Sequence, residues 1–271
     1  MNQMTEPNPV RPVLNAVLSL GLLGMLSPAS AALLLDASSG VVHTSASMGV
    51  ADKDDGAFAG AYVFLTPFFG GNLADPAPTV SLNGFIRFGE GDGSDGSFLQ
   101  PLGLVGMTRI APMWVDFRIG TSGQVIQHAD PGFNYYGVTW ENMESVEFPG
   151  KHATFQAIFF EAATTLHGVD FNAGDIAFSY ADVSLFPTIT ETVIGLEDGA
   201  DFATIPLLDG TRGAASYINY GDFPVGENEY IHLRPDGAGN YVSTIAPIPE
   251  PAAALLGAAG ALALLRRRNR G

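Results

Sequence analysis

The stretch DIAFSYADV, residues 175–183, alternates large and small side chains. The large residues Ile176, Phe178 and Tyr180 share one side of an extended backbone, and small residues occupy the other side. Alternation with a period of two is typical of a strand that is buried on its heavier face. The stretch therefore predicts a β-strand and sets the pattern to look for elsewhere in the chain.

Similar short runs recur along most of the chain. They are rich in valine, isoleucine, phenylalanine and tyrosine, and turn-forming residues bound each one. They occupy residues 61–69, 79–89, 109–119, 123–129, 134–143, 153–163, 175–185, 191–199, 215–221, 229–235 and 240–246. Helical spacing is nearly absent between them. The pattern predicts an all-β fold, most simply an antiparallel β-sandwich-like single domain over residues 61–245.

Individual residues add detail to this prediction. Residues 32–60 are small and polar, which indicates an N-terminal arm with one short strand. The pair Asn83-Gly84 is typical of a tight turn or a bulge. Pro112 is expected at a strand end or in an edge strand, because proline cannot donate to a β-ladder. The two tryptophans, Trp114 and Trp140, are expected in the core between the sheets.

Charge and cysteine content exclude several classes of function. The formal net charge of the 271 residues is −16, so a nucleic-acid partner, which demands a basic surface, is not expected. The chain contains no cysteine. Thiol catalysis, thiolate metal sites and disulfide scaffolds are therefore excluded, and stability must come from burial and hydrogen bonding.

The N-terminal residues have the order of a secretory signal peptide. Arg11 precedes an apolar run over residues 13–26, and small residues follow at Ala29 and Ala31. The apolar run is shorter than the ~20 residues that a membrane-spanning helix needs. We therefore expect residues 1–31 to form a signal helix that is cleaved after Ala31.

The C-terminal residues 246–271 form a three-part pattern. An acidic residue between two prolines is followed by an apolar run over residues 252–265 and then by a cluster of arginines. The parts are Pro249, Glu250 and Pro251, and Arg266, Arg267, Arg268 and Arg270. The apolar run is marginal as a permanent membrane span, and the arginines would stay cytoplasmic.

This pattern resembles the PEP-CTERM sorting signal of Gram-negative bacteria. The resemblance implies a transient membrane helix, cleavage near the tripeptide by an exosortase-type processing protease, and delivery of the domain to the cell surface, the outer membrane or the extracellular matrix. Export through the inner membrane agrees with the signal peptide at the other end of the chain.

Five phrases between residues 80 and 201 occur in an order that resembles the nidogen-like extracellular domain, NIDO. They are LNGFIRFG (82–89), RIAPMWVDF (109–117), VTWENM (138–143), TFQAIFF (154–160) and GDIAFSYADV (174–183). The resemblance implies an extracellular β-rich module of the cell–matrix adhesion type. The family has no established catalytic centre, so no catalytic residue is carried over.

An alternative interpretation uses Trp140, Glu141 and Glu144 as the site of a secreted carbohydrate-binding or hydrolytic β-sandwich. Paired carboxylates held ~5–9 Å apart are the acid and base of glycosidases. If the backbone around them is extended, however, Glu141 and Glu144 point to opposite faces of the sheet.

Metal binding is predicted only at the loop GEGDGSDG, residues 89–96. Its Glu90, Asp92 and Asp95 offer the oxygen ligands that calcium prefers, although the spacing is not that of a known calcium loop. A hydrated hairpin loop is the alternative. The five histidines are scattered and do not suggest a zinc site.

The sequence thus predicts a non-catalytic, secreted or surface-displayed adhesion or extracellular-matrix protein associated with exopolysaccharide. Its expected partners are the exosortase-type protease, a matrix polysaccharide or protein, and the membrane transiently. Calcium is the one candidate cofactor.

Overall fold

The computed structural model describes residues 33–36, 38, 40–44, 47, 54–60, 62–73, 77–89, 108–183, 192–199, 201–203, 225 and 228–249. Within these residues every regular element is a β-strand and every sheet is antiparallel, so the predicted all-β class is confirmed. No helix in this part of the chain is long and apolar enough to cross a membrane. The predicted signal helix and sorting helix lie outside the described residues.

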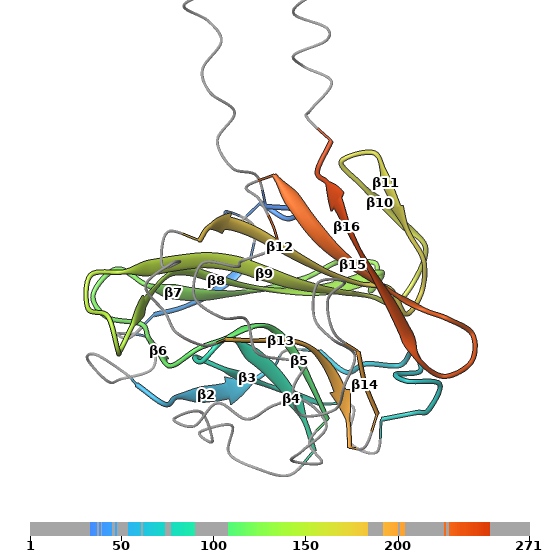
Figure 1. Cartoon of the computed structure of the whole chain (residues 1–271), viewed down its shortest axis with the longest axis horizontal. Helices are drawn as coiled ribbons and strands as arrows, with labels where there is room; N and C mark the ends of the chain where they lie inside the picture. The colour runs from blue at the N-terminus through green and yellow to red at the C-terminus, as the bar shows by residue number, and fades with distance from the viewer. Residues whose placement is uncertain are drawn as a thin grey trace, which may run out of the picture. The chain divides into compact units, whose positions relative to one another are not determined.

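A large sheet of eight strands has the order β1-β7-β8-β9-β12-β15-β16, and β6 also pairs with β8 (Figure 1). Its strands are β1 (Val41–His43), β6 (Phe117–Arg118), β7 (Gln124–Ala129), β8 (Tyr135–Ser145), β9 (His152–Phe160), β12 (Ile176–Asp182), β15 (Glu229–Pro235) and β16 (Tyr241–Pro247). Three of the six neighbouring pairs in this order, β7-β8, β8-β9 and β15-β16, are consecutive in the chain, and the other three join strands that are further apart in the sequence.

A small sheet of six strands has the order β14-β13-β5-β4-β3-β2 (Figure 1). Its strands are β2 (Ala57–Ala59), β3 (Pro78–Ser81), β4 (Phe85–Phe88), β5 (Thr108–Trp114), β13 (Val193–Asp198) and β14 (Asp201–Ala203). The strands β10 (Thr164–Leu166) and β11 (Val169–Phe171) form a separate hairpin. This hairpin was not predicted, because its strands of three residues are too short to show an alternation.

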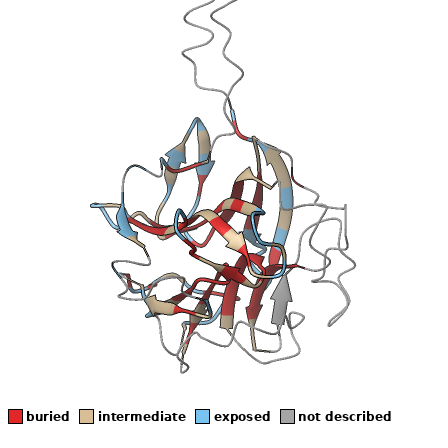
Figure 2. Cartoon of the chain, turned by 90° about the vertical axis from the view of Figure 1, so that its left-hand side faces the viewer, coloured by how far each residue is buried: buried red, intermediate tan, exposed pale blue. Residues whose placement is uncertain are grey.

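The main hydrophobic core lies between the two sheets, and Figure 2 shows the buried residues gathered in the interior. The small sheet contributes Val80 and Ile86, and the large sheet contributes Val138 and Phe155. Trp140 stacks on Phe155 with a centroid distance of 5.2 Å. The core that the alternating runs predict is therefore built from the inner faces of both sheets.

Strand β12, which forms most of the alternating stretch 175–183, lies near the middle of the large sheet. In β12 the residues Ile176, Phe178 and Tyr180 all belong to the main core, as their alternation predicts. The Tyr180 hydroxyl donates a hydrogen bond to the carbonyl of Pro112 in the small sheet at 2.7 Å. Burial raises the pKa of this tyrosine well above its usual value, so the hydroxyl remains a donor.

Pro112 does not lie at an edge, so that prediction is wrong. Its strand β5 lies between β4 and β13. The pairing with β4 covers only Thr108 to Ile110, and the register with β13 shifts between Val193 and Gly195. The ladder is thus interrupted around Pro112, which explains how an interior strand accommodates a residue without an N–H group.

The N-terminal residues contribute more strand than the sequence predicts. The run 32–60 supplies β1, which pairs with β7 in the large sheet, and β2, which pairs with β3 in the small sheet. Within the predicted strand 61–69, the described residues 62–69 form no regular strand and have only an isolated bridge between Phe68 and Gly71. The segment nevertheless buries Tyr62, Phe64, Phe68 and Phe69 in the main core. The predicted strand at 215–221 lies outside the described residues.

Both tryptophans are fully buried, but only Trp140 lies in the main core between the sheets, as predicted, whereas Trp114 belongs to a separate cluster. Their ring nitrogens also differ in hydrogen bonding. Trp140 Nε1 donates a hydrogen bond to the carbonyl of Ser81 at 2.8 Å, which ties the large sheet to the small one. Trp114 packs beside Phe85 on the other face of the small sheet, and the described structure gives its Nε1 no hydrogen bond.

Trp140→Phe is expected to lower the free energy of unfolding by about 0.5–1.5 kcal/mol more than Trp114→Phe, because only the first change removes a hydrogen bond, the one to the Ser81 carbonyl, which the Gly84 amide also contacts at 3.4 Å. The two substitutions remove the same atoms, so each serves as the control for the packing lost in the other. Urea unfolding of both variants measures the difference. Equal losses would contradict a role for the Ser81 hydrogen bond.

Candidate functional site

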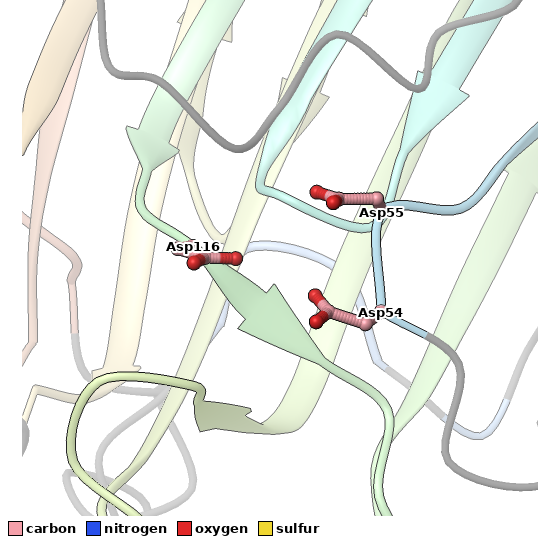
Figure 3. Close-up of side chains that lie close together, drawn as sticks. All are labelled: Asp54, Asp55 and Asp116. Carbon is pink, nitrogen blue, oxygen red and sulfur yellow. The ribbon is translucent and has the colours of Figure 1, made fainter.

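Three carboxylates converge at one end of the β5–β6 connection (Figure 3). Asp54, Asp55 and Asp116 each bring an oxygen within 4.8 Å of the others. Among the residues that the structure describes, this acidic trio is the only group of three potential ligands that meets so closely. Sequence reasoning missed it, because Asp116 is distant in the chain from the other two.

The fold positions each member of the trio through backbone contacts. Asp54 forms an isolated bridge with Arg118, and Asp116 lies where the chain passes from β5 of the small sheet to β6 of the large sheet. Asp55 has a positive φ of 46°, which aspartate tolerates better than most residues. Its carboxylate accepts a hydrogen bond from Asn83 Nδ2 at 3.0 Å.

The electrostatic environment of Asp116 is unfavourable for its charged form. Desolvation by burial, together with the carboxylates of Asp54, Asp55 and Glu147, raises the pKa of Asp116 to about 6. Its Oδ1 atom is buried and has no hydrogen-bond partner among the described residues. A proton or a cation would relieve the repulsion.

The trio offers oxygen atoms alone, the ligand type that a hard cation such as calcium or magnesium prefers over zinc. Three carboxylates supply fewer than the 6–8 oxygen ligands that calcium takes, so backbone oxygens or water would have to complete a site.

The predicted calcium ligands Glu90, Asp92 and Asp95 lie outside the described residues. The same is true of the signal-cleavage residues Ala29 and Ala31, and of most of the sorting signal, namely Glu250, Pro251, Arg266, Arg267 and Arg268. Pro249 is described, and it is exposed two residues after the end of β16.

The structure does not support Trp140 as a sugar-stacking platform, because the ring is fully buried. It also corrects the expectation for the two glutamates. The register of β8 against β9 shifts between Trp140 and Met143, and both of these residues point into the main core. The intervening bulge, with Asn142 at a φ of 51°, therefore places Glu141 and Glu144 on the same outer face.

These glutamates nevertheless have structural partners. Glu144 accepts hydrogen bonds from Arg118 Nε at 3.0 Å and from the Gly150 amide at 2.7 Å. These bonds lower the pKa of Glu144, whereas a general acid needs a raised pKa. Glu141 accepts a hydrogen bond from the side-chain amide of Gln124.

Glu141 also lines a shallow groove of about 370 Å³ on the outer face of the large sheet. The other lining residues are Leu33, Leu35, Asp36, Thr154, His167 and Ala181. The groove brings one of the two glutamates of the hydrolytic alternative next to a hollow, and its lining mixes apolar with acidic side chains.

The described histidines are engaged separately. His128 contacts the hydroxyl of Thr139 at 3.0 Å, and His232 contacts the Asp175 carboxylate at 2.9 Å. His43 stacks on Phe58 with a centroid distance of 4.1 Å. Within the described residues, none of these histidines belongs to a group of three potential metal ligands.

Comparisons of the chain with protein-family models, with curated proteins and with solved structures found no match. The resemblances to the NIDO domain and to the PEP-CTERM signal therefore stay predictions that depend on the quoted residues.

The raised pKa of Asp116 predicts that stability falls as the pH rises from about 4 to about 6. Over this range the folded state holds a proton that the unfolded state, with a pKa near ~3.9, has released. Asp116→Asn removes this titration, so the variant is expected to lose less stability than the parent between these pH values. Urea unfolding at a series of pH values measures the difference.

Asp170→Asn is the control, because Asp170 is exposed on the β10–β11 hairpin. An Asp116→Asn variant with the parent's pH dependence would contradict the prediction. Melting the same proteins with and without calcium, alongside a variant with Asp92→Ala and Asp95→Ala, shows whether a calcium effect belongs to the trio or to the predicted loop.

Proposed function

We propose that the chain is a non-catalytic adhesion or extracellular-matrix protein, associated with exopolysaccharide and delivered to the cell surface by an exosortase-type protease. The observation that carries the proposal is the pair of processing signals on either side of an all-β domain. Pro249 supports it, since the first residue of the sorting tripeptide is exposed just beyond the last strand. Calcium is kept as a proposed cofactor.

A loop surface formed by Val63, Leu65 and Phe133 supports a binding role. These apolar side chains are 49%, 78% and 68% exposed. The ring of Phe133 lies 6.0 Å from that of Tyr62, and the Glu161 carboxylate accepts a hydrogen bond from the Leu65 amide at 3.0 Å. Contact between the two loops brings the exposed groups together, as expected for binding through loops rather than a deep pocket.

The conformation of its turn exposes the Phe133 side chain to solvent. Phe133 has a positive φ of 58°, which is costly for a bulky residue. Asp130 holds the turn through bonds from the amides of Gly132 at 3.0 Å and Asn134 at 3.1 Å. An exposed aromatic residue held in a costly backbone conformation supports a functional surface, because such conformations cluster at binding sites.

A carbohydrate-binding or hydrolytic protein is the second candidate. The groove at Glu141 is the observation that favours it. Against this candidate, Trp140 is buried and cannot stack on a sugar. The lowered pKa of Glu144 also does not suit a general acid. We therefore rank it below the adhesion function.

Mass spectrometry of the mature protein from its producing cells tests the sorting signal. We expect a chain that lacks Arg266, Arg267 and Arg268, and we expect a variant with Pro249→Ala and Glu250→Ala to retain them. Thr244→Ala is the control, since Thr244 is exposed on β16 outside the tripeptide. A mature parent protein that keeps its arginines would overturn the assignment.

Binding to the exopolysaccharide of the producing cells tests the loop surface. Phe133→Ser is expected to weaken binding at least about fivefold, as loss of an aromatic anchor does. Val242→Ser removes another exposed apolar side chain, 55% exposed on β16, and should leave binding unchanged. Turnover of a glycan that Glu141→Gln abolishes would instead favour the hydrolytic candidate.

A further inference from the structure

The residues that follow the predicted signal-cleavage site are buried. Leu34 is 1% exposed and Leu35 is 6% exposed, although both belong to the predicted polar arm. They lie on the face of the large sheet that points away from the small sheet, in an outer cluster that is separate from the main core. The members of this outer cluster are Leu34, Leu35, Ile158, Phe160, Phe171, Ala177, Tyr230 and Ile248.

Polar side chains of the sheet hold the backbone of this segment. Gln156 Oε1 accepts a hydrogen bond from the Leu35 amide at 3.0 Å, and Gln156 Nε2 donates one to the Leu35 carbonyl at 3.3 Å. The Leu34 amide donates to Ser179 Oγ at 3.4 Å. A side-chain amide that pairs with both polar groups of one residue recognises an extended peptide backbone whatever its side chain.

The polar side chains Thr139, Gln156 and Ser179 form a row across the outer face of the large sheet, which we call the docking slot. The three residues are aligned across β8, β9 and β12 by the strand register, and all three are fully buried. Gln156 Nε2 also donates to Thr139 Oγ1 at 2.7 Å. Thr139 also contacts His128 at 3.0 Å, and Ser179 Oγ donates to Gln156 Oε1 at 3.4 Å. The backbone of Leu34 and Leu35 adds further partners for these buried polar groups, which are costly to bury unless they are paired.

The shape of the sheet also fits the segment. Gly137 of β8 lies under Leu35, and a Cβ atom added at Gly137 would come within 2.5 Å of Leu35 Cδ1. A larger residue there would displace the leucine. Both the hydrogen bonds and the space are therefore matched to this segment.

The other end of the domain meets the same cluster. Ile248 is 5% exposed and belongs to the outer cluster, and its amide donates to the Asn228 carbonyl at 2.7 Å. The next residue, Pro249, is exposed and begins the predicted sorting tripeptide. Residues adjacent to the two predicted cleavage sites thus share one small hydrophobic cluster.

We infer that the docking slot is a binding site for the chain's own segment Leu33–Asp36, and that the docked segment secures Ile248 and so fixes the point at which the predicted sorting tripeptide follows the domain. The link between the docking slot and C-terminal cleavage rests on the proposed function. With Ile248 held, the processing protease meets the tripeptide next to a rigid domain. With Ile248 released, the tripeptide would follow a longer free segment.

Native-state hydrogen exchange of the mature chain tests the inference. In a variant with Leu34→Ser and Leu35→Ser, the Ile248 amide is expected to exchange at least about tenfold faster than in the parent, through local opening. The Val115 amide, which donates to the Asn83 carbonyl at 3.2 Å just after β5, should change much less. The control is Val41→Ser with Val42→Ser, which alters exposed residues of β1.

Equal acceleration of the Ile248 and Val115 amides, or no acceleration of Ile248, would overturn the inference. If the double variant does not fold, Leu34→Ala alone is measured by the same criterion. A synthetic peptide of residues 32–38, added to the double variant, should restore the protection of Ile248, and failure to do so would contradict a binding slot.

Exchange measurements on purified protein do not depend on sorting. Arginines retained in the mature parent would refute the exosortase proposal while leaving the docking result intact. Faster C-terminal cleavage of the double variant in cells, without a change in the control, would link the slot to processing.

Discussion

The turn at Asn83 and Gly84 is the constraint on which the arrangement of the two sheets depends. Gly84 has a φ of 79°, and a Cβ atom there would lie 2.0 Å from the Met113 carbonyl oxygen, so only glycine fits. Asn83 is fully buried, and its Oδ1 accepts a hydrogen bond from the Phe117 amide at 2.8 Å. The turn thereby fixes the crossing from β5 to β6, where the chain leaves one sheet and enters the other.

The acidic trio is a consequence of this same turn. Asn83 binds Asp55 through its side chain and fixes the residues on both sides of Asp116 through Val115 and Phe117. The carboxylates are brought together by a connection that the core requires. A buried amide that orders the backbone therefore also sets the environment that raises the pKa of Asp116.

The sequence predicts those parts of the fold that depend on local alternation. In the runs 79–89 and 175–183, both the strands and their buried faces can be predicted, because the larger apolar side chains of each run pack directly in the core. The bulge at Asn142 could not be predicted, because a positive φ at a residue other than glycine is decided by its neighbours. The trio could not be predicted either, because the pairing of distant strands brings its members together. Only the run of acidic residues that contains Asp54 and Asp55 gave a local signal.

The outer cluster is best understood from the absence of cysteine in the chain. Chain ends fray unless something ties them down, and many secreted domains use disulfides for this. Here hydrogen bonds from Gln156 and Ser179 hold the N-terminal segment, and apolar burial holds Ile248. Such bonds are individually weak, so the ends can open without unfolding the sheets. Under the proposed function, securing both ends of the domain in one cluster by such weak contacts suits processing at both of them.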